Sequence, residues 1–585
     1  MVKILTRVLT ASLPSVGAFV SPLGSRSANK IINDVSRRTK VPVQAVDAEA
    51  KDTFAAGSSK GSFANFDYEA HWYPVSWARD LQVNDPTKVT VFDVDYVVSK
   101  TANGEIICME DKCAHKGAAL SQGRVTGNGK NFQCAYHGWS FDGKSGECTE
   151  IPQLVQADGS STQIPSRACG TAVPAQIQQE MVWIFPGGGL EKALQAPSPP
   201  LVQEVETGGF KLGQFVRDFP VDWPIVVSNI FDPDHGLFAH QATTFDMYSA
   251  SSMYPLEIQN NYPDDGKGWV LESKVQAQDK LLDVNAKLRE AQGESKKKEK
   301  KKDEKELWAS SYFQAPFHLQ LKRVDPETGS TNFVSTFYIC PVGVGRTRFM
   351  AAQGSKTATP RWLTKLFTDN FLDQDTYLLA TQQKNILTAE AKEVEELLKT
   401  VSSAEELKSV SMKTRKKMFC LTSPTEKVGA RLENFWDDTL LRVPNRIQRL
   451  LQLNAVGAFA TTPPREVVLD RKSQQYDISN DSKDVVKNCQ KVSKYSKLAA
   501  VASIALRFTN KAPKALTSPT ATIATLGLCF LVSSIAQKLE REYYFKYTDD
   551  YRRKDLAKIP KKIWIDKEYI EGDHRDCIPF TNYSD

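Results

Sequence analysis

The chain has 585 residues, of which 41% are hydrophobic and 25% are charged, a composition that indicates folded protein in about two to four domains. The formal net charge of +6 is concentrated in residues 1–40, which contain seven basic residues and a single acid, Asp34. Without that arm the chain is nearly neutral, so the charge indicates no nucleic-acid partner. The ten cysteines are too scattered for a disulfide framework.

Residues 1–60 predict a targeting presequence followed by a linker. Residues 4–20 are a short apolar run after Lys3, and the next twenty residues are rich in serine and basic side chains and almost free of acids. Phe19 stands at the expected cleavage point, directly after Gly17-Ala18. This arrangement resembles the bipartite presequences of algae with complex plastids, and it implies a plastid location.

A first domain is predicted over residues 61–190. It begins at HWYPVSW (71–77) and continues with short β-rich runs such as VTVFDVDYVV (89–98) and EIICME (105–110), up to MVWIFPGGG (181–189). These runs predict a domain that is rich in β-strands.

A second domain is predicted over residues 191–470, with strands such as FVSTFYICPV (333–342) and helical stretches over 361–398. It contains an insertion at 283–307 with the charged run KKKEKKKDEKE (296–306). Charge runs of this kind are usually solvated, so we expect a surface insertion that carries no chemistry.

The C-terminal region, 471–545, predicts a membrane anchor, followed by a tail over 546–585. Ala515–Gln537 is 23 residues without a charge, which is long enough to span a bilayer with some tilt. A weaker apolar run, Leu498–Leu506, could complete a hairpin with it. The alternative is a buried pair of C-terminal helices.

Two short segments in the first domain form the first candidate metal centre. They carry Cys113-x-His115 and Cys134-x₂-His137, with eighteen residues between the pairs. Zinc could bind two thiolates and two imidazoles, but structural zinc sites usually pair cysteine with cysteine and histidine with histidine. In a Rieske [2Fe–2S] centre two cysteines hold one iron and two histidines hold the other, so each segment supplies one of each. The pattern favours this cluster.

The glycines of the same segments, Gly117, Gly123 and Gly138, are expected to let main-chain amides approach the cluster sulfurs. The stretches EDKCAHKGAALSQG (110–123) and CAYHGWSFDGKSGECTEIPQ (134–153) resemble the Rieske domain of ring-hydroxylating and pheophorbide a oxygenases. The resemblance is strongest to the plastid group, which includes the Rieske subunit of the chloroplast inner-envelope translocon and protochlorophyllide-linked oxygenases.

The second candidate metal centre lies in SNIFDPDHGLFAH (228–240), where His235 and His240 are five residues apart. A non-haem iron oxygenase needs two histidines and one carboxylate, with positions left open for O₂. Helical turns around 229–240 could place Asp232 and His235 on one side. Without the neighbouring Rieske pattern, such histidines would more often be core or capping residues.

The third ligand is expected in DNFLDQDTYLLATQQ (369–383), which reads as a helix. The motif of the resembled family ends in a Gln-Asp pair, which Gln374-Asp375 matches, and Asp375 is therefore our choice. Asp373 and Asp369 remain alternatives. The resemblance also implies that Asp232 binds no iron, but hydrogen-bonds one histidine of the mononuclear site and Rieske His115 or His137 of a neighbouring subunit in a homotrimer.

No dinucleotide-binding or phosphate-binding glycine motif is found. Electrons are therefore expected from ferredoxin or a separate reductase, and from NADPH only indirectly. The plastid group often carries a C-terminal Cys-x₂-Cys, but here Val492 follows Cys489 at the second place, so a dithiol switch is not expected.

The resemblance implies an α+β architecture: an N-terminal all-β Rieske domain, then a mixed α/β, helix-grip-like catalytic domain with mononuclear iron, and a C-terminal membrane helix or hairpin. It implies a monooxygenase in a plastid envelope or thylakoid membrane that uses O₂ on a chlorophyll-type tetrapyrrole, pheophorbide a first. Two alternatives remain: a non-catalytic, redox-sensing Rieske component of a plastid envelope translocon, and a simple Rieske electron carrier. A sensor has no need for the iron ligands, and a carrier needs only the first domain.

Overall fold

The computed structural model describes residues 63–544, apart from residues 64, 157–158, 161, 208, 233–234, 236–257, 262–267, 276–306, 326, 356–360, 422–425 and 509–517. The presequence predicted over 1–60, the charged run at 296–306 and the tail predicted over 546–585 lie outside the described residues.

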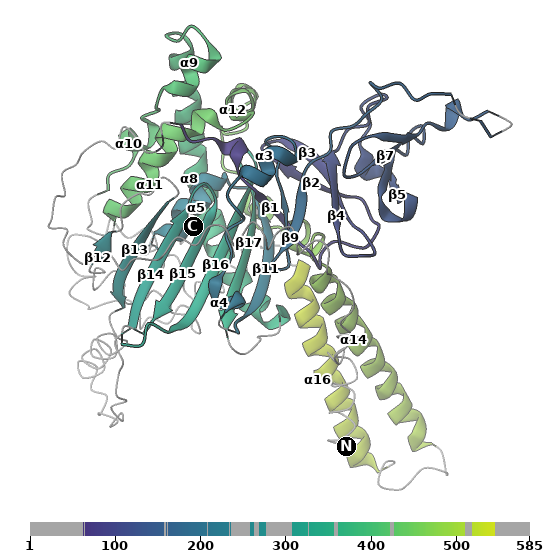
Figure 1. Ribbon diagram of the computed structural model, residues 1–585. Helices are drawn as coiled ribbons and strands as arrows, with labels where there is room; N and C mark the ends of the chain where they lie inside the picture. Colours follow the sequence, from purple (N-terminus) through teal and green to yellow (C-terminus); the bar gives the residue numbers. More distant parts are fainter. Residues whose placement is uncertain are drawn as a thin grey trace, which may run out of the picture. The chain divides into compact units, whose positions relative to one another are not determined.

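The first part of the chain folds into three small antiparallel sheets (Figure 1). Their hydrogen-bonded orders are β1-β10-β9, β2-β3-β4 and β5-β6-β7-β8. The strands are β1 (Tyr73–Trp77), β2 (Thr87–Val91), β3 (Val94–Lys100), β4 (Ile106–Glu110), β5 (Arg124–Thr126), β6 (Asn131–Gln133), β7 (Ser140–Asp142), β8 (Cys148–Glu150), β9 (Ala175–Gln178) and β10 (Met181–Ile184). Short 3₁₀ turns lie at η1 (Tyr68–Ala70), η2 (Leu120–Gln122), η3 (Gly127–Gly129) and η4 (Pro152–Leu154).

The β-rich run 89–98 is divided into two strands of one hairpin. Phe92 and Asp93 both have a left-handed backbone, with φ of 53° and 61°, so the chain reverses between β2 and β3. Asp93 is held there because its carboxylate accepts from Arg346 Nη2 at 2.6 Å and from the Val344 N–H at 3.1 Å. Contacts from a distant part of the chain thus stabilise a turn that the local sequence does not predict.

The second part contains a seven-stranded antiparallel sheet in the order β11-β17-β16-β15-β14-β13-β12. Its strands are β11 (Lys211–Phe219), β12 (Ile258–Asn261), β13 (Gly268–Val275), β14 (Leu307–Gln314), β15 (His318–Val324), β16 (Thr331–Gly343) and β17 (Arg346–Ser355). Val275 and Leu307 are paired at the facing ends of β13 and β14. The charged run therefore belongs to the connection between two neighbouring strands, which is where a sheet tolerates an insertion.

Helices come before the first strand of this sheet in the sequence, between its strands and after its last strand. They are α3 (Leu190–Gln195), α4 (Gln203–Glu206), α5 (Trp223–Phe231), α8 (Arg361–Leu398), α9 (Ala404–Ser409), α10 (Thr414–Met418), α11 (Glu426–Thr439), α12 (Arg446–Ala455) and α13 (Arg465–Val468), with a 3₁₀ turn η5 (Leu440–Arg442) and a π-helical turn η6 (Lys472–Tyr476). α5 packs against β15, β16 and β17, and α8 packs against β11 (Figure 1). The α+β class is confirmed, and α8 covers the helical stretch predicted over 361–398.

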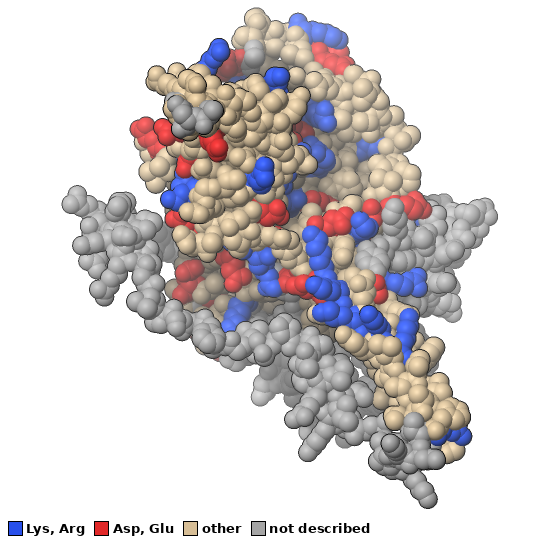
Figure 2. Space-filling view, turned by 90° about the vertical axis from the view of Figure 1, so that its right-hand side faces the viewer, with Lys and Arg blue, Asp and Glu red and all other residues tan. Residues whose placement is uncertain are grey.

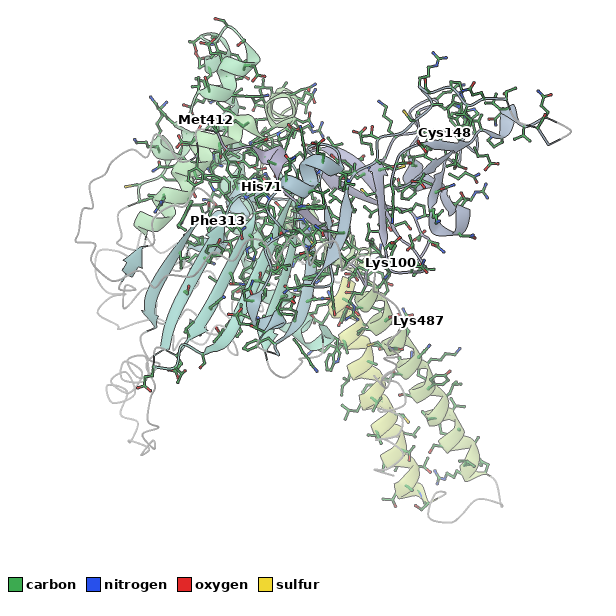
Figure 3. The ribbon with its side chains drawn as sticks, viewed as in Figure 1. His71, Lys100, Cys148, Phe313, Met412 and Lys487 are labelled. Atoms are coloured by element: carbon green, nitrogen blue, oxygen red, sulfur yellow. The ribbon has the colours of Figure 1, made fainter. Side chains whose placement is uncertain are left out.

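An aromatic cluster joins the sheet to its helices. Phe313 of β14 lies in the core (Figure 3), with its ring centroid 4.8 Å from that of Trp269 and 6.0 Å from that of Trp436 on α11. Phe435, the neighbour of Trp436, reaches Phe63 at 4.7 Å. These buried rings fix α11 against the open face of the sheet.

The first and second predicted domains share one hydrophobic core. Tyr68 Oη lies 2.8 Å from Thr439 Oγ1, and Trp77 Nε1 donates to the Phe215 carbonyl at 2.9 Å. A separate, smaller core belongs to the first domain and contains Cys113, Leu120 and Cys134. The chain entering the first domain is therefore anchored in the second, while the segment that carries the cysteine and histidine pairs has a core of its own.

The C-terminal region is a pair of helices, α14 (Asn480–Arg507) and α16 (Pro519–Tyr544), which pack side by side (Figure 1). Small polar residues lie on the contact, where Ser493 Oγ is 3.0 Å from Ser533 Oγ. α16 is the one described helix long and apolar enough to cross a membrane, over Pro519–Tyr543 with a mean hydropathy of 1.6. The pairing predicted from the two apolar runs is therefore observed, and the helix that carries the longer apolar run begins at Pro519.

The outer surface of this pair changes character along its length. Lys483, Lys487, Lys491, Lys494 and Lys497 are all exposed on α14. Figure 2 shows basic side chains gathered where the pair leaves the rest of the chain, and Lys487 is labelled there in Figure 3. Beyond them, exposed apolar side chains follow on both helices: Leu498, Val501, Ile504, Ile523 and Phe530.

Candidate functional site

The first candidate centre is built by the two segments that carry the cysteine and histidine pairs. Cys113 follows β4 and Cys134 follows β6, and each thiol is buried, with 2% of the residue exposed. The Cys113 thiol is within hydrogen-bonding reach of the Cys134 thiol. Two segments that are eighteen residues apart in sequence thus bring their sulfurs together at one point.

The two segments have the same main-chain design. The Cys113 N–H donates to the Ala118 carbonyl at 2.8 Å and the Gly117 N–H to the Cys113 carbonyl at 2.9 Å. In the second segment the Cys134 N–H donates to the Trp139 carbonyl at 2.9 Å and the Gly138 N–H to the Cys134 carbonyl at 3.0 Å. Each segment is therefore a tight loop closed on its own cysteine.

Glycine is needed at the fourth residue after each cysteine. Gly117 and Gly138 have φ of 75° and 77°, a left-handed backbone that side chains disfavour. Gly123 is needed for a different reason. Its N–H donates to the Leu120 carbonyl at 2.9 Å, and a Cβ there would lie 2.0 Å from the Gln133 carbonyl oxygen. Gly123 therefore lets the chain before β5 approach β6, and the approach of main-chain amides to the cluster sulfurs stays a prediction.

The imidazoles complete the arrangement. The ring centroids of His115 and His137 are 4.5 Å apart, and the His115 ring stacks on Trp139 at 4.6 Å with an interplanar angle of 1°. Gln153 Nε2 donates to the His137 carbonyl at 2.9 Å and holds the second loop from outside. Sequence reasoning missed Gln153, although it lies in the quoted motif.

The donor set fits a two-iron cluster. His115 Nδ1 is buried and has no hydrogen-bond partner among the described residues, as a nitrogen reserved for a metal would be. In the part of the chain that the structure describes, no three His, Cys, Asp or Glu side chains converge on a single metal ion. In a Rieske centre each iron takes only two protein ligands and the sulfides supply the rest, so such a convergence is not required.

The second candidate centre is built around His235. His235 Nδ1 lies 2.7 Å from the Asp232 main-chain carbonyl, so Nδ1 carries the hydrogen and donates it. Nε2 then carries the lone pair, and it lies 3.9 Å from Asp375 Oδ1. Histidines that bind metals commonly donate their other N–H to a carbonyl in this way.

The helix expected around 229–240 ends earlier than predicted. α5 stops at Phe231, and Asp232 has an extended backbone with φ of −89° and ψ of 111°. Pro233 follows, and a residue before proline is restricted to this region. The expected helical alignment of Asp232 with His235 was therefore wrong: the two meet through the main-chain carbonyl in a turn. His240 lies outside the described residues.

The three acids of α8 have different partners. Asp373 pairs with Arg217 Nη1 at 2.7 Å and with Arg471 Nε at 3.0 Å. Asp369 pairs with Lys365 Nζ at 3.0 Å. Burial alone would raise the pKa of Asp373, but the guanidinium groups of Arg471 and Arg217 hold it below its usual value. Asp375 is the acid that lies opposite His235.

A cavity of about 520 Å³ opens beside His235 and Asp375. Apolar side chains from α5, α8 and the segment after α10 form much of its wall, including Ile225, Leu379 and Phe419. Polar groups in the wall include Asp232, Glu426 and Glu433. A cavity that joins apolar side chains to polar groups beside a histidine and a carboxylate is suited to binding a small molecule.

Two parts of the chain match known families. Residues 71–168 match the Rieske [2Fe-2S] domain, and residues 313–393 match pheophorbide a oxygenase. Chloroplastic pheophorbide a oxygenase of Oryza sativa subsp. japonica is 36% identical over 190 residues, which are 32% of this chain and 36% of that protein. The protochlorophyllide-dependent translocon component 52, chloroplastic, of Arabidopsis thaliana is 29% identical over 368 residues, 58% of this chain and 63% of that protein.

The chain therefore spans between about a third and two thirds of the length of these curated relatives. The crystal structure of dicamba monooxygenase bound to dicamba is 16% identical at a TM-score of 0.43, over 67% of this chain and 99% of that one. All four candidate cluster ligands lie inside the Rieske match, and Asp375 lies inside the pheophorbide a oxygenase match. The chain carries a Rieske [2Fe-2S] domain followed by a pheophorbide a oxygenase domain, and it is a relative of the plastid Rieske oxygenases.

Proposed function

We propose that the chain is a Rieske-type monooxygenase. Cys113, His115, Cys134 and His137 would hold the [2Fe–2S] cluster, and His235, His240 and Asp375 would hold iron(II). The observation that carries the proposal is the His235 Nε2 lone pair facing the Asp375 carboxylate in the wall of a large cavity, in a chain that also has the paired cysteine loops. A Rieske electron carrier has no use for the second arrangement.

When bound, the cluster and the iron supply single-electron transfer and O₂ activation. The chain's own residues prepare both sites. The two closed loops hold four donors without rearrangement, and the Asp232 carbonyl fixes the tautomer of His235 so that Nε2 points toward the ligand position. The apolar side chains in the wall, including Leu379 and Phe419, favour contact with a hydrophobic substrate.

The substrate we propose is a chlorophyll-type tetrapyrrole, with pheophorbide a as the first choice. The match of residues 313–393 to pheophorbide a oxygenase supports this class, and the size and apolar lining of the cavity are compatible with a large, flat, hydrophobic ligand. Electrons would come from ferredoxin or a separate reductase. Asp232 would connect the cluster of one subunit to the iron of its neighbour in a homotrimer.

We place the protein at a plastid membrane. The names of the relatives support the plastid, since both are chloroplastic proteins. The apolar helix α16 and the exposed apolar side chains of α14 support insertion of the helix pair, with the lysines of α14 near the lipid headgroups.

A second candidate is a redox-sensing Rieske component of a plastid envelope translocon. One specific observation favours it, since the relative that spans 58% of this chain is named as a translocon component. In that case the cluster would cycle between redox states and no substrate would be oxygenated.

The experiment that tests the proposal is incubation of the iron-loaded protein with chlorophyll intermediates, reduced ferredoxin and ¹⁸O₂. We expect one intermediate to gain a single labelled oxygen atom, detected by mass spectrometry. The matched control is Asp375→Asn, which should keep the cluster spectrum and form no labelled product. A cluster that is reduced and reoxidised normally while no intermediate gains oxygen would contradict the enzyme and support the sensor.

A further inference from the structure

A buried network of charged side chains lies against the cavity on the side of α11. It joins two arginines to four carboxyl groups: Arg415 and Arg446 with Asp222, Glu390, Glu433 and Asp437. Arg446 pairs with Asp222 Oδ2 and Glu390 Oε2, both at 2.7 Å. Arg415 pairs with Glu390 Oε1 at 2.6 Å, Glu433 Oε2 at 3.0 Å and Asp437 Oδ1 at 3.8 Å.

The network holds more acid than base. Two guanidinium groups cannot neutralise four carboxylates, and an uncompensated buried charge is costly in a medium of low dielectric constant. The simplest relief is for one carboxyl group to keep its proton at neutral pH. The geometry indicates which carboxyl group could hold a proton and donate it into the cavity.

Two members of the network line the cavity, Arg415 and Glu433, and Glu433 is the carboxyl group of the two. Its side chain is 13% exposed, whereas those of Glu390, Asp222 and Asp437 are 0%, 0% and 5% exposed. It lines the cavity from the same face of α11 as Glu426 and Gly429, which lie seven and four residues before it. A proton held by Glu433 can therefore pass into the chamber that also contains His235 and Asp375.

The immediate surroundings of Glu433 favour the protonated acid. Burial raises the pKa of the Glu433 carboxyl to about 7, with Asp437 and Glu390 acting in the same direction and Arg415 and the Ser228 hydroxyl opposing it. Trp436 Nε1 donates to Ser228 Oγ at 3.1 Å, so the hydroxyl hydrogen of Ser228 is directed away from that ring and is available to Glu433. These groups come from α5, α8, α10 and α11, the elements around this carboxyl group.

We propose that Glu433 is a catalytic acid, which delivers a proton to O₂ in the cavity during oxygenation. The inference rests on the proposed monooxygenase function. That reaction converts a substrate C–H group and O₂ into C–OH and water. It consumes two protons and two electrons, which the ferredoxin or reductase delivers one at a time. The O–O bond breaks, one oxygen atom enters the C–H bond, and the other leaves as water with both protons. Glu433 supplies one of the two protons and regains it from solvent after each turnover.

The proposal fixes the direction of the pH dependence. The acid must be protonated to act, so the rate of product formation should fall as the pH rises through about 7. In Glu433→Gln this limb should disappear and the rate should drop by about 10²-fold, since general acid catalysis usually contributes at least that much. Glu433→Asp should restore part of the rate with a descending limb.

The matched control is Asp437→Asn. Asp437 belongs to the same network on the same helix, but it accepts from the Arg415 and Lys416 N–H groups and does not line the cavity. If Glu433 acts only by supporting the fold, the two variants should lose activity alike. If it is the catalytic acid, Asp437→Asn should lose stability and keep a descending limb, shifted to lower pH because Asp437 no longer raises the pKa of Glu433, while Glu433→Gln should lose the limb and release more peroxide per O₂ consumed.

A readout without substrate separates this inference from the proposed function. Infrared difference spectra of the wild-type protein should show a carboxylic-acid C=O band that disappears as the pH rises through about 7. The band should be absent in Glu433→Gln and present in Asp437→Asn. A wild-type protein without this band, or a Glu433→Gln variant with normal coupling of O₂ to product, would overturn the proposal. A band with this titration in a protein that oxygenates no tetrapyrrole would instead count against the proposed substrate.

Discussion

Asp373 and Asp375 lie two residues apart on one helix, and the same substitution at each should have opposite consequences. In Asp373→Asn two buried arginines lose a shared carboxylate. Arg217 and Arg471 are 0% and 2% exposed, and their nitrogens lie 2.7 and 3.0 Å from Asp373. Removing one partner of a buried ion pair costs about 3–5 kcal/mol because it leaves an uncompensated charge, so we expect a loss of about 4 kcal/mol in the free energy of unfolding.

Asp375→Asn removes a carboxylate that lies at a long distance, 3.9 Å, from His235 Nε2. We expect a change of less than about 1 kcal/mol in the free energy of unfolding of the metal-free protein. The variant should instead fail to hold mononuclear iron. Urea denaturation followed by circular dichroism gives the stability, and elemental analysis beside the cluster absorbance gives the two kinds of iron.

The reasoning would be refuted by the reverse pattern. If Asp373→Asn lost mononuclear iron at unchanged stability while Asp375→Asn kept it, Asp373 would be the ligand and its ion pairs with the two arginines would not be what stabilises the fold. Asp369→Asn is a third arm, because Asp369 pairs with Lys365 and should affect stability without loss of iron.

Three further predictions concern the other regions. His137→Ala should abolish the Rieske-type electron paramagnetic resonance signal of the reduced protein while the chain stays folded, because the loop is closed by main-chain bonds to Cys134; a preparation that holds zinc and no sulfide would contradict the cluster. Asp232→Asn should keep a reducible cluster and bound iron but form almost no product, and product formation at the wild-type rate would show that the Asp232 carboxylate has no part in electron transfer. Carbonate-washed membranes should retain the full chain and release one that ends at Ser479, before α14 and α16; retention of both would place the membrane contact elsewhere.

The ligand types of the first centre were readable from sequence because each depends only on local chemistry. Cys113 and Cys134 each sit in a loop that closes on itself within five residues, so the spacing of cysteine, histidine and glycine carries the geometry. The long helix α8 and the strand β16 were predicted for the same reason: their patterns are continuous and no distant contact is needed to decide them.

Where local structure depends on contacts with residues far away in sequence, the sequence left alternatives open or led to a different expectation. The turn at Phe92 and Asp93 is held by Arg346, more than two hundred residues away in sequence. Gly123 was assigned to the cluster because it stands in the motif, yet the Gln133 carbonyl is what demands a glycine there.

The acids of α8 show the division most clearly. Asp369 and Asp373 are one turn apart and face the same side, toward Lys365, Arg217 and Arg471. Asp375 lies about 200° around the helix from Asp373 and faces His235. The sequence determined that a helix would carry the candidate ligand. Only the packing of that helix between the arginines and the cavity decided which acid faces His235, and only the same packing brought Glu433, which stands in no motif, into the cavity wall.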